Sequence, residues 1–168
     1  MQQDELRGLL TAVAAERLAL IQRHEAAARV VSHYDFNNAY QYVIAREETH
    51  LSWLRAALEE MGVPMPPAAA EIPVPSISRT GKSADAAAFR SILEDDARQL
   101  SAFVERWRPR VAAVTHARHR TMLNVVLGES IEHQRLFAQA ASGFEDVIGR
   151  RTAGAARVGE VLPTRWQE

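Results

Sequence analysis

Two short runs of acidic residues and histidines could bind metal ions. The first run is Glu47 and His50, and the second contains Glu129, Glu132 and His133. Side chains three positions apart are neighbours on one face of a helix, so each run can present a carboxylate and an imidazole to the same point. Such ligands suit iron or manganese, and zinc also accepts them. Both runs therefore predict metal ligands.

Two single acidic residues, Glu16 and Asp96, interrupt apolar stripes elsewhere in the chain. Glu16 has apolar residues three positions before it and four positions after it, and Asp96 has them at −4, −3, +4 and +7. We expect both side chains to point into the core. Glu94 instead has arginines at −4 and +4, which predicts a solvated, salt-bridged face.

The predicted core contains more acidic groups than basic ones, because no inward Lys or Arg is evident from the pattern in these turns. Unpaired charges in a core cost several kcal/mol each. Two divalent or trivalent metal ions would supply the missing positive charge. We therefore expect a two-metal site whose ligands are Glu16, Glu47, His50, Asp96, Glu129, Glu132 and His133.

Four amphipathic helices are predicted to position these residues, because apolar residues recur at spacings of three and four. Asn37 or Asn38 can cap the second helix, and Pro109 ends or kinks the third. Residues 1–148 form one all-α domain in this interpretation, and residues 149–168 form a C-terminal tail. The predicted helices span residues 4–31, 37–62, 83–108 and 112–148.

Residues 63–82 contain five of the seven prolines and can form neither a continuous helix nor a central strand. Fully extended at ~3.3 Å per residue, this connector could reach ~66 Å, whereas a helix of about 26 residues is ~39 Å long. The connector can therefore run the length of the bundle. We expect two antiparallel helical hairpins joined by this long crossover, since an up-down-up-down bundle needs only short loops.

The spacing of the candidate ligands agrees with two such hairpins. Residues at one level of an antiparallel hairpin are equidistant from its turn, so Glu16 and Glu47 require a turn near residues 31–32. Asp96 and Glu129 require one close to the predicted start of the fourth helix. The two separations are 31 and 33 residues, which is the near-equality that two-fold pseudosymmetry would produce.

The arrangement resembles the ferritin-like superfamily and, within it, the rubrerythrin-type diiron proteins. The resemblance covers roughly residues 5–145. It rests on Glu16, on the E-x-x-H sequence that begins at Glu47, on the acidic Asp96 and on the E-x-x-E-H sequence that begins at Glu129. It implies a ferritin-like four-helix bundle that holds two metal ions, iron in the first place and manganese as the alternative.

By this resemblance Glu47 and Glu129 would bridge the metals, and Glu16 and Asp96 would be terminal ligands. The side chains that complete the ligand set would be His50, Glu132 and His133. The family usually has Glu where this chain has Asp96. The sequence contains no cysteine, so the rubredoxin-like electron-transfer module of full rubrerythrins is missing and the electron donor would be an external protein.

The resemblance implies redox chemistry toward O2 or peroxide, as a peroxidase or as a ferroxidase that takes Fe(II). Tyr40 is on the same face as Glu47 and could donate a hydrogen bond to a ligand or be a redox neighbour, although a core tyrosine is the more favoured interpretation. Two alternatives stay open: an iron storage or cargo protein, and a metal-free ferritin-like bundle that acts in protein interaction.

The other histidines are assigned no ligand role. His24 is expected in the core or beside a ligand, His33 in a turn, and His116 and His119 on a solvated basic face next to two arginines. A hemerythrin-type site needs about five histidine ligands, and only His50 and His133 lie on inward stripes at the proposed level.

Composition limits the classes of partner. Twenty basic residues against 21 acidic ones give a net charge of −1, so no global field favours nucleic acid or an anionic membrane. The sequence shows neither a signal-peptide pattern nor an apolar run of membrane-spanning length. We expect a cytoplasmic protein, from a GC-rich bacterial source by its Arg and Ala usage, and a homodimer is among the open oligomeric states.

Overall fold

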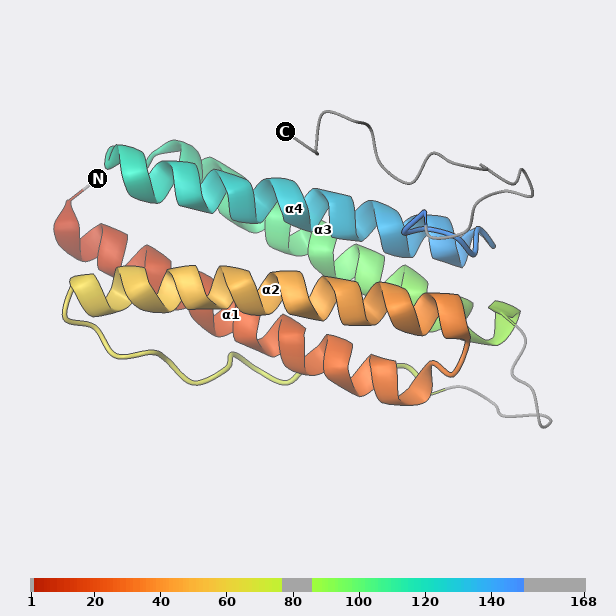
Figure 1. Cartoon of the computed structure of the whole chain (residues 1–168). Coiled ribbons are helices and arrows are strands. Elements are labelled where there is room, and N and C mark those ends of the chain that lie inside the picture. The colour runs from red at the N-terminus through yellow and green to blue at the C-terminus, as the bar shows by residue number, and fades with distance from the viewer. Residues whose placement is uncertain (1, 77–85, 150–168) are drawn as a thin grey trace, which may run out of the picture.

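The computed structural model describes residues 2–76 and 86–149. These residues form four α-helices and one short 3₁₀ helix and contain no strand, and the helices lie side by side in a bundle (Figure 1). The prediction of an all-helical four-helix bundle is confirmed for this part of the chain. The elements are α1 (Gln3–Val30), α2 (Tyr34–Glu60), η1 (Ala86–Phe89), α3 (Arg90–Ala112) and α4 (Ala117–Ala141).

A tight turn at residues 31–33 joins α1 to α2, so these helices run side by side in opposite directions (Figure 1). The side-chain amide of Asn37 donates to the carbonyl oxygens of Ala28 at 2.7 Å and Val31 at 3.0 Å. Asn37 thus satisfies the end of α1 and does not cap α2, which begins at Tyr34, earlier than predicted.

Glycines end both α2 and α4. Gly62 and Gly143 have φ angles of 69° and 96°, a left-handed conformation that glycine adopts without steric cost. The residue after Gly143 donates its N–H to the carbonyl of Gln139 at 3.1 Å, and Gly143 donates to that of Ala140 at 3.0 Å. This motif satisfies the last carbonyls of α4. The helix therefore stops at Ala141, before its predicted end at residue 148.

The turn of the second hairpin lies later in the chain than predicted, at residues 113–116 and not at 109–111. Pro109 lies inside α3, which continues to Ala112. Pro109 cannot donate to the carbonyl of Glu105 four residues earlier, and both residues are exposed. His116 caps α4 by accepting a hydrogen bond from the N–H of His119 at 3.4 Å. As a result α4 begins at Ala117 and not at residue 112.

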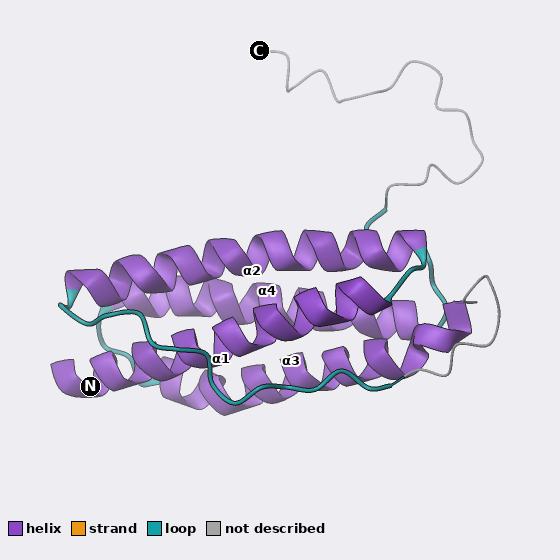
Figure 2. Cartoon of the chain, turned by 90° about the horizontal axis from the view of Figure 1, so that it is seen from below, coloured by secondary structure: helices purple, strands orange, loops and turns teal. Residues whose placement is uncertain are grey.

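After α2 the chain follows the bundle without regular secondary structure, and Figure 2 shows this connector passing over α1. Ala69 donates its N–H to the carbonyl of Ala15 at 2.9 Å, and the guanidinium of Arg23 donates to the carbonyl of Pro73. These bonds hold the connector against α1. Residues 77–85, which include the end of the predicted crossover and the start of the predicted third helix, lie outside the described residues. Residues 150–168 of the predicted tail also lie outside them.

The core lies between the helices and is filled by the predicted apolar stripes. Fully buried members come from all four helices and include Leu10, Phe36, Phe103 and Phe137. The most extensive contacts join α3 to α4 and α1 to α2. Within the described ranges, no helix has the length and apolar character needed to cross a membrane.

Candidate functional site

A fully buried arginine, Arg17, occupies the centre of the bundle. Its two terminal nitrogens donate hydrogen bonds to Glu47 Oε1 and Ser130 Oγ, each at 2.5 Å. The guanidinium carbon lies 4.3 Å from the ring centroid of Phe103, a cation–π arrangement. The Ser130 hydroxyl in turn donates to the carbonyl of Val126 at 2.7 Å. Arg17 thus links α1 to all three other helices.

A second buried arginine, Arg23, lies two turns further along α1 and is 2% exposed. Its Nε donates to Asp96 Oδ1 and one terminal nitrogen donates to Asp95 Oδ2, both at 2.9 Å. Its other terminal nitrogen binds the carbonyl of Pro73 in the connector. The hydroxyl of Tyr40 donates to the second oxygen of Asp96. Every oxygen of the Asp96 carboxylate is therefore hydrogen-bonded.

His24 connects the two ion pairs. Its Nδ1 lies 2.8 Å from Glu47 Oε2, and its Nε2 lies 3.7 Å from Asp96 Oδ1. Burial alone would lower the pKa of His24, but the charges of Glu47 and Asp96 and the hydrogen bond to Glu47 outweigh it, and the pKa is raised. The core cluster of Arg17, Arg23, His24, Glu47 and Asp96 is therefore a connected network of opposite charges.

Electrostatics keep Glu47 ionised in this cluster. Burial would raise the pKa of its carboxyl group, but the charges of His24 and Arg17, the hydrogen bond to His24 and the nearby imidazole of His133 hold that pKa well below its usual value. Burial raises the pKa of Tyr40 well above its usual value, so the phenol retains the proton that it donates to Asp96. The pKa of the Asp96 carboxyl is raised by burial, which outweighs the opposing charges of His24 and Arg23.

Glu16, which was predicted to point into the core, lies at the interface of α1 with α3. Its carboxylate accepts hydrogen bonds from Trp107 Nε1 at 2.9 Å and from Arg106 at 2.5 Å, and its side chain is 17% exposed. The adjacent residue, Arg17, takes the central position. Successive helical residues are rotated by about 100°, so this difference of one residue exchanges a carboxylate for a guanidinium.

Glu129 and Glu132 lie on the outer side of α4. Glu129 accepts two hydrogen bonds from Arg46, at 2.6 and 3.0 Å, and its side chain is 28% exposed. Glu132 is 64% exposed and pairs with Arg135 on its own helix. The residues of α4 that face the core at this level are Ser130 and His133.

Two histidines lie next to Glu47 and Glu129. His50 Nε2 is 2.9 Å from Glu129 Oε2, His133 Nδ1 is 3.8 Å from Glu47 Oε1, and the two imidazole rings stack with centroids 6.1 Å apart. Burial, followed by the charge of Arg17, lowers the pKa of His50 to about 4. His50 is therefore neutral at pH 7 and donates its Nε2 proton to Glu129.

The expectation that no basic residue points inward is wrong, since Arg17 and Arg23 are buried among the carboxylates. The oxygens of Glu47 are bound by Arg17 and His24. Two of the seven predicted ligands, Glu16 and Glu132, point away from the cluster. In this arrangement the side chains do not fit two metal ions, because the bridging carboxylate is already occupied and a guanidinium lies where positive charge was expected.

The burial of Glu47, His50 and Asp96 was expected from the stripes, but the role of Arg17 was not. A signal for it does exist: the alternating spacing of four and three that runs from Leu10 through Val13, Leu20 and Ala27 includes Arg17 and His24. In α4 the same alternation connects Leu123, Val126, Ser130, His133 and Phe137, all of them buried. Glu129 and Glu132 do not belong to it.

Comparison of the chain with protein-family models, with curated proteins and with solved structures found no match.

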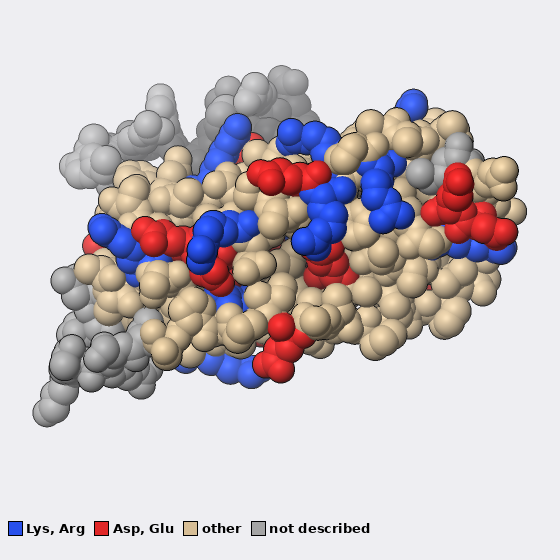
Figure 3. Space-filling model, turned by 180° about the vertical axis from the view of Figure 1, so that it is seen from behind, with Lys and Arg blue, Asp and Glu red and all other residues tan. Residues whose placement is uncertain are grey.

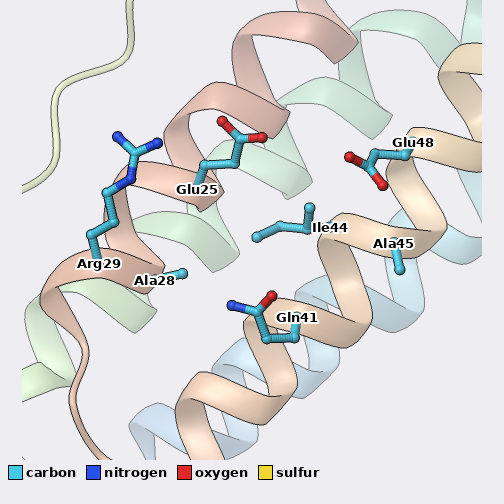
Figure 4. Close-up of a pocket in the computed structure, with 7 residues that line it drawn as sticks. All are labelled: Glu25, Ala28, Arg29, Gln41, Ile44, Ala45 and Glu48. Atoms are coloured by element: carbon cyan, nitrogen blue, oxygen red, sulfur yellow. The ribbon is translucent and has the colours of Figure 1, made fainter.

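Two parts of the described surface do not offer a second concentration of charge like that of the core cluster. One groove of about 430 Å³ lies between α1 and α2, where Ile44 is flanked by the carboxylates of Glu25 and Glu48 (Figure 4). Figure 3 shows basic and acidic side chains interspersed over one face of the molecule, without a large area of a single sign. Neither feature resembles a site for a strongly charged ligand.

Proposed function

We propose that this chain is a ferritin-like bundle in which buried arginines replace metal ions as the positive charges of the core, and that it acts in protein interaction. The observation that carries the proposal is the guanidinium of Arg17 bound between Glu47 and Ser130. The ferritin-like assignment is supported by the two helical hairpins and by the connector, which follows the bundle after α2 as far as residue 76 (Figure 1).

The pairing of residues on α2 and α4 supports the replacement of metal by arginine. On α2 the buried pair at i, i+3 is Glu47 and His50, and on α4 it is Ser130 and His133. Ser130 therefore stands where a symmetric two-metal site would have its second bridging carboxylate. A hydroxyl carries no charge to balance a metal ion, but it accepts a hydrogen bond from Arg17.

Charge balance supports the same conclusion. The guanidiniums of Arg17 and Arg23 match the carboxylates of Glu47 and Asp96 one to one, and arginine stays protonated in proteins. A divalent ion at Glu47 would face the positive charge of Arg17 at close range. Its binding would require Arg17 to leave a fully buried position.

The interaction role is supported by an exposed groove of about 710 Å³ beside α2 and α4. Four apolar side chains line it, Tyr42, Leu136, Val147 and Ile148, together with the polar side chains of Glu132, Arg135 and Gln139. Aromatic and aliphatic side chains that lie among polar ones on an exposed surface are typical of protein interfaces. Because both charge signs are present on one face, a second copy of this chain is the partner we propose.

The experiment that tests the proposal is loading the purified protein with Fe(II) without oxygen, followed by desalting and exposure to O2. We expect no oxo-bridged absorption from the wild-type protein and the same result from a Glu47→Gln variant. About two irons per chain, with an absorption that Glu47→Gln abolishes, would contradict the proposal and establish a dinuclear site.

A dinuclear iron protein with redox activity toward O2 or peroxide is the second candidate. It is favoured by ring nitrogens of His24, His50 and His133, which are buried without a hydrogen-bond partner within the described part of the chain. Buried polar atoms of this kind point to an additional ligand. The same Fe(II) experiment separates the two candidates, because only this one predicts iron that depends on Glu47.

A further inference from the structure

A histidine and two carboxylates meet at the end of the bundle where α2 begins and α4 has ended. His33 immediately precedes α2, Asp35 is in its first turn, and Glu145 is in the segment after α4. Figure 1 shows that the start of α2 and the end of α4 lie at the same end of the molecule. One ligand atom of each residue lies within 4.8 Å of those of the other two.

The imidazole of His33 is held in place by an aromatic contact. Its ring centroid lies 4.2 Å from that of Phe36, and Phe36 is fully buried. Nε2 of His33 is thereby directed at Glu145, with 3.6 Å between Nε2 and Oε1. The other ring nitrogen, Nδ1, is buried and has no hydrogen-bond partner among the described residues.

The distance between His33 and Glu145 is longer than a hydrogen bond, which has a donor–acceptor distance of about 2.7–3.2 Å. It is close to the ~3.0–3.4 Å that separates two neighbouring ligands bound at ~2.1 Å to one metal ion. Asp35, whose relative exposure is 8%, adds a second carboxylate to the same point. The three donor atoms lie within 4.8 Å of one another, so rotation of the side chains is enough to bring them around one cation.

We propose that His33, Asp35 and Glu145 bind one divalent transition-metal ion, with water completing its coordination. One imidazole and two carboxylates match the ligand preferences of zinc and also those of manganese and iron. Bound metal would join the beginning of α2 to the segment that follows α4. The site shares no residue with the core cluster and does not depend on the proposed function.

The experiment is a calorimetric titration of the chelator-treated full chain with Zn²⁺. We expect about one Zn²⁺ per chain in the wild type, and binding weakened at least ~10-fold in His33→Gln and in Glu145→Gln. Glu145→Gln preserves the shape of a half-buried side chain in the segment after α4, so its fold is expected to be intact by circular dichroism. Zn²⁺ should also raise the Tm of the wild type and not that of Glu145→Gln.

Two variants serve as matched controls. His116→Gln removes the histidine that precedes α4 at the opposite end of the bundle, and Glu105→Gln removes an exposed carboxylate on α3. Both are expected to bind Zn²⁺ as the wild type does. The proposal is overturned if the wild type binds no Zn²⁺, or if His33→Gln and Glu145→Gln bind it as tightly as the controls.

Discussion

At the scale of single residues, the chemistry of the core depends on which of two neighbours on α1 faces inward. Glu16 would have added a carboxylate to the centre, whereas Arg17 brings a guanidinium that binds Glu47 and Ser130. A buried charge that loses its partner is costly, because the low-dielectric interior does not solvate it. Arg17 and Glu47 are therefore expected to matter for stability as a pair.

The first prediction concerns this pair. Arg17→Met should lower the free energy of unfolding by about 3–5 kcal/mol, because it removes the guanidinium that pairs with the buried carboxylate of Glu47. The double variant Arg17→Met/Glu47→Met should lose less than the single one. Urea denaturation measures both, with Arg29→Met, an exposed arginine of the same helix, expected within about 0.5 kcal/mol of wild type. An Arg17→Met variant as stable as the control would contradict the assignment.

A second prediction follows from the low pKa of His50, about 4. The folded state disfavours protonated His50, whereas the unfolded chain takes up the proton near pH 6.5. His50 therefore contributes stability above pH 6.5 that is lost as the pH falls toward 4, by up to about 3 kcal/mol. The groups that face it are Arg17, Glu129 and His133.

Denaturation of wild type and His50→Gln between pH 7 and pH 4 measures this contribution. The loss of stability with acid should be smaller in His50→Gln, and His116→Gln should follow the wild type. Comparison with the wild type isolates His50 from His24, whose raised pKa acts in the opposite direction because its contribution is lost as the pH rises. Parallel curves for all three proteins would contradict the prediction.

At the scale of elements, side chains and glycines at the helix ends set the lengths of the helices. Gly62 ends α2 and Gly143 ends α4 by supplying left-handed residues. Asn37, in the first turns of α2, donates hydrogen bonds to two backbone carbonyls at the end of α1. The turn between α1 and α2 is thus closed by local hydrogen bonds, and these bonds help to fix the level at which Arg17 meets Glu47.

The third prediction tests this closure. Asn37→Ala removes both hydrogen bonds to α1 and should reduce the free energy of unfolding by about 1–2 kcal/mol. Asn38→Ala is the matched control, since it makes the same change one residue later; of the two side chains, only that of Asn37 binds these carbonyls. Thermal or urea denaturation of both variants gives the answer. Equal effects at the two positions would show that the cross-helix bonds contribute nothing.

At the scale of the whole molecule, the bundle has a core in which buried arginines pair with buried carboxylates. It also has a groove beside α2 and α4 that is partly lined by apolar side chains. A stable dimer buries roughly 1,200–2,000 Å² of surface in total, more than the groove alone supplies. The neighbouring faces of α2 and α4, with charges of both signs, would have to contribute the rest. The groove itself would supply the aromatic and aliphatic contacts at the centre of such an interface.

The fourth prediction is that the protein forms a dimer through this face. Sedimentation velocity at increasing concentration should show a dimer for the wild type and a monomer for Tyr42→Glu and for Leu136→Glu. Val125→Glu, which changes an exposed apolar residue of α4 outside the groove, should remain dimeric. If the wild type is monomeric at all concentrations, the prediction that a second copy of this chain is the partner is contradicted.

The sequence by itself determined the four helices, the level of the first hairpin turn and the burial of Glu47, His50 and Asp96. These features follow from local periodicity, which persists whatever the helices pack against. The alternating spacing of three and four is compatible with the observed rotation of α1 and α4 about their axes, but the tertiary structure decided it. A shift of one residue moves a side chain by about 100°, and several registers of α1 include apolar residues.

What selected the register was the fit between helices. Arg17 can be buried only because Glu47 and Ser130 come from two other helices, and Arg23 only because Asp96 and the connector meet it. A long arginine is unfavourable in a core without such partners. The partners of Arg17 are 30 and 113 residues away along the chain, and those of Arg23 are 73 and 50 residues away. A local sequence pattern could therefore not show that side chains of the protein itself would balance the charges of the core.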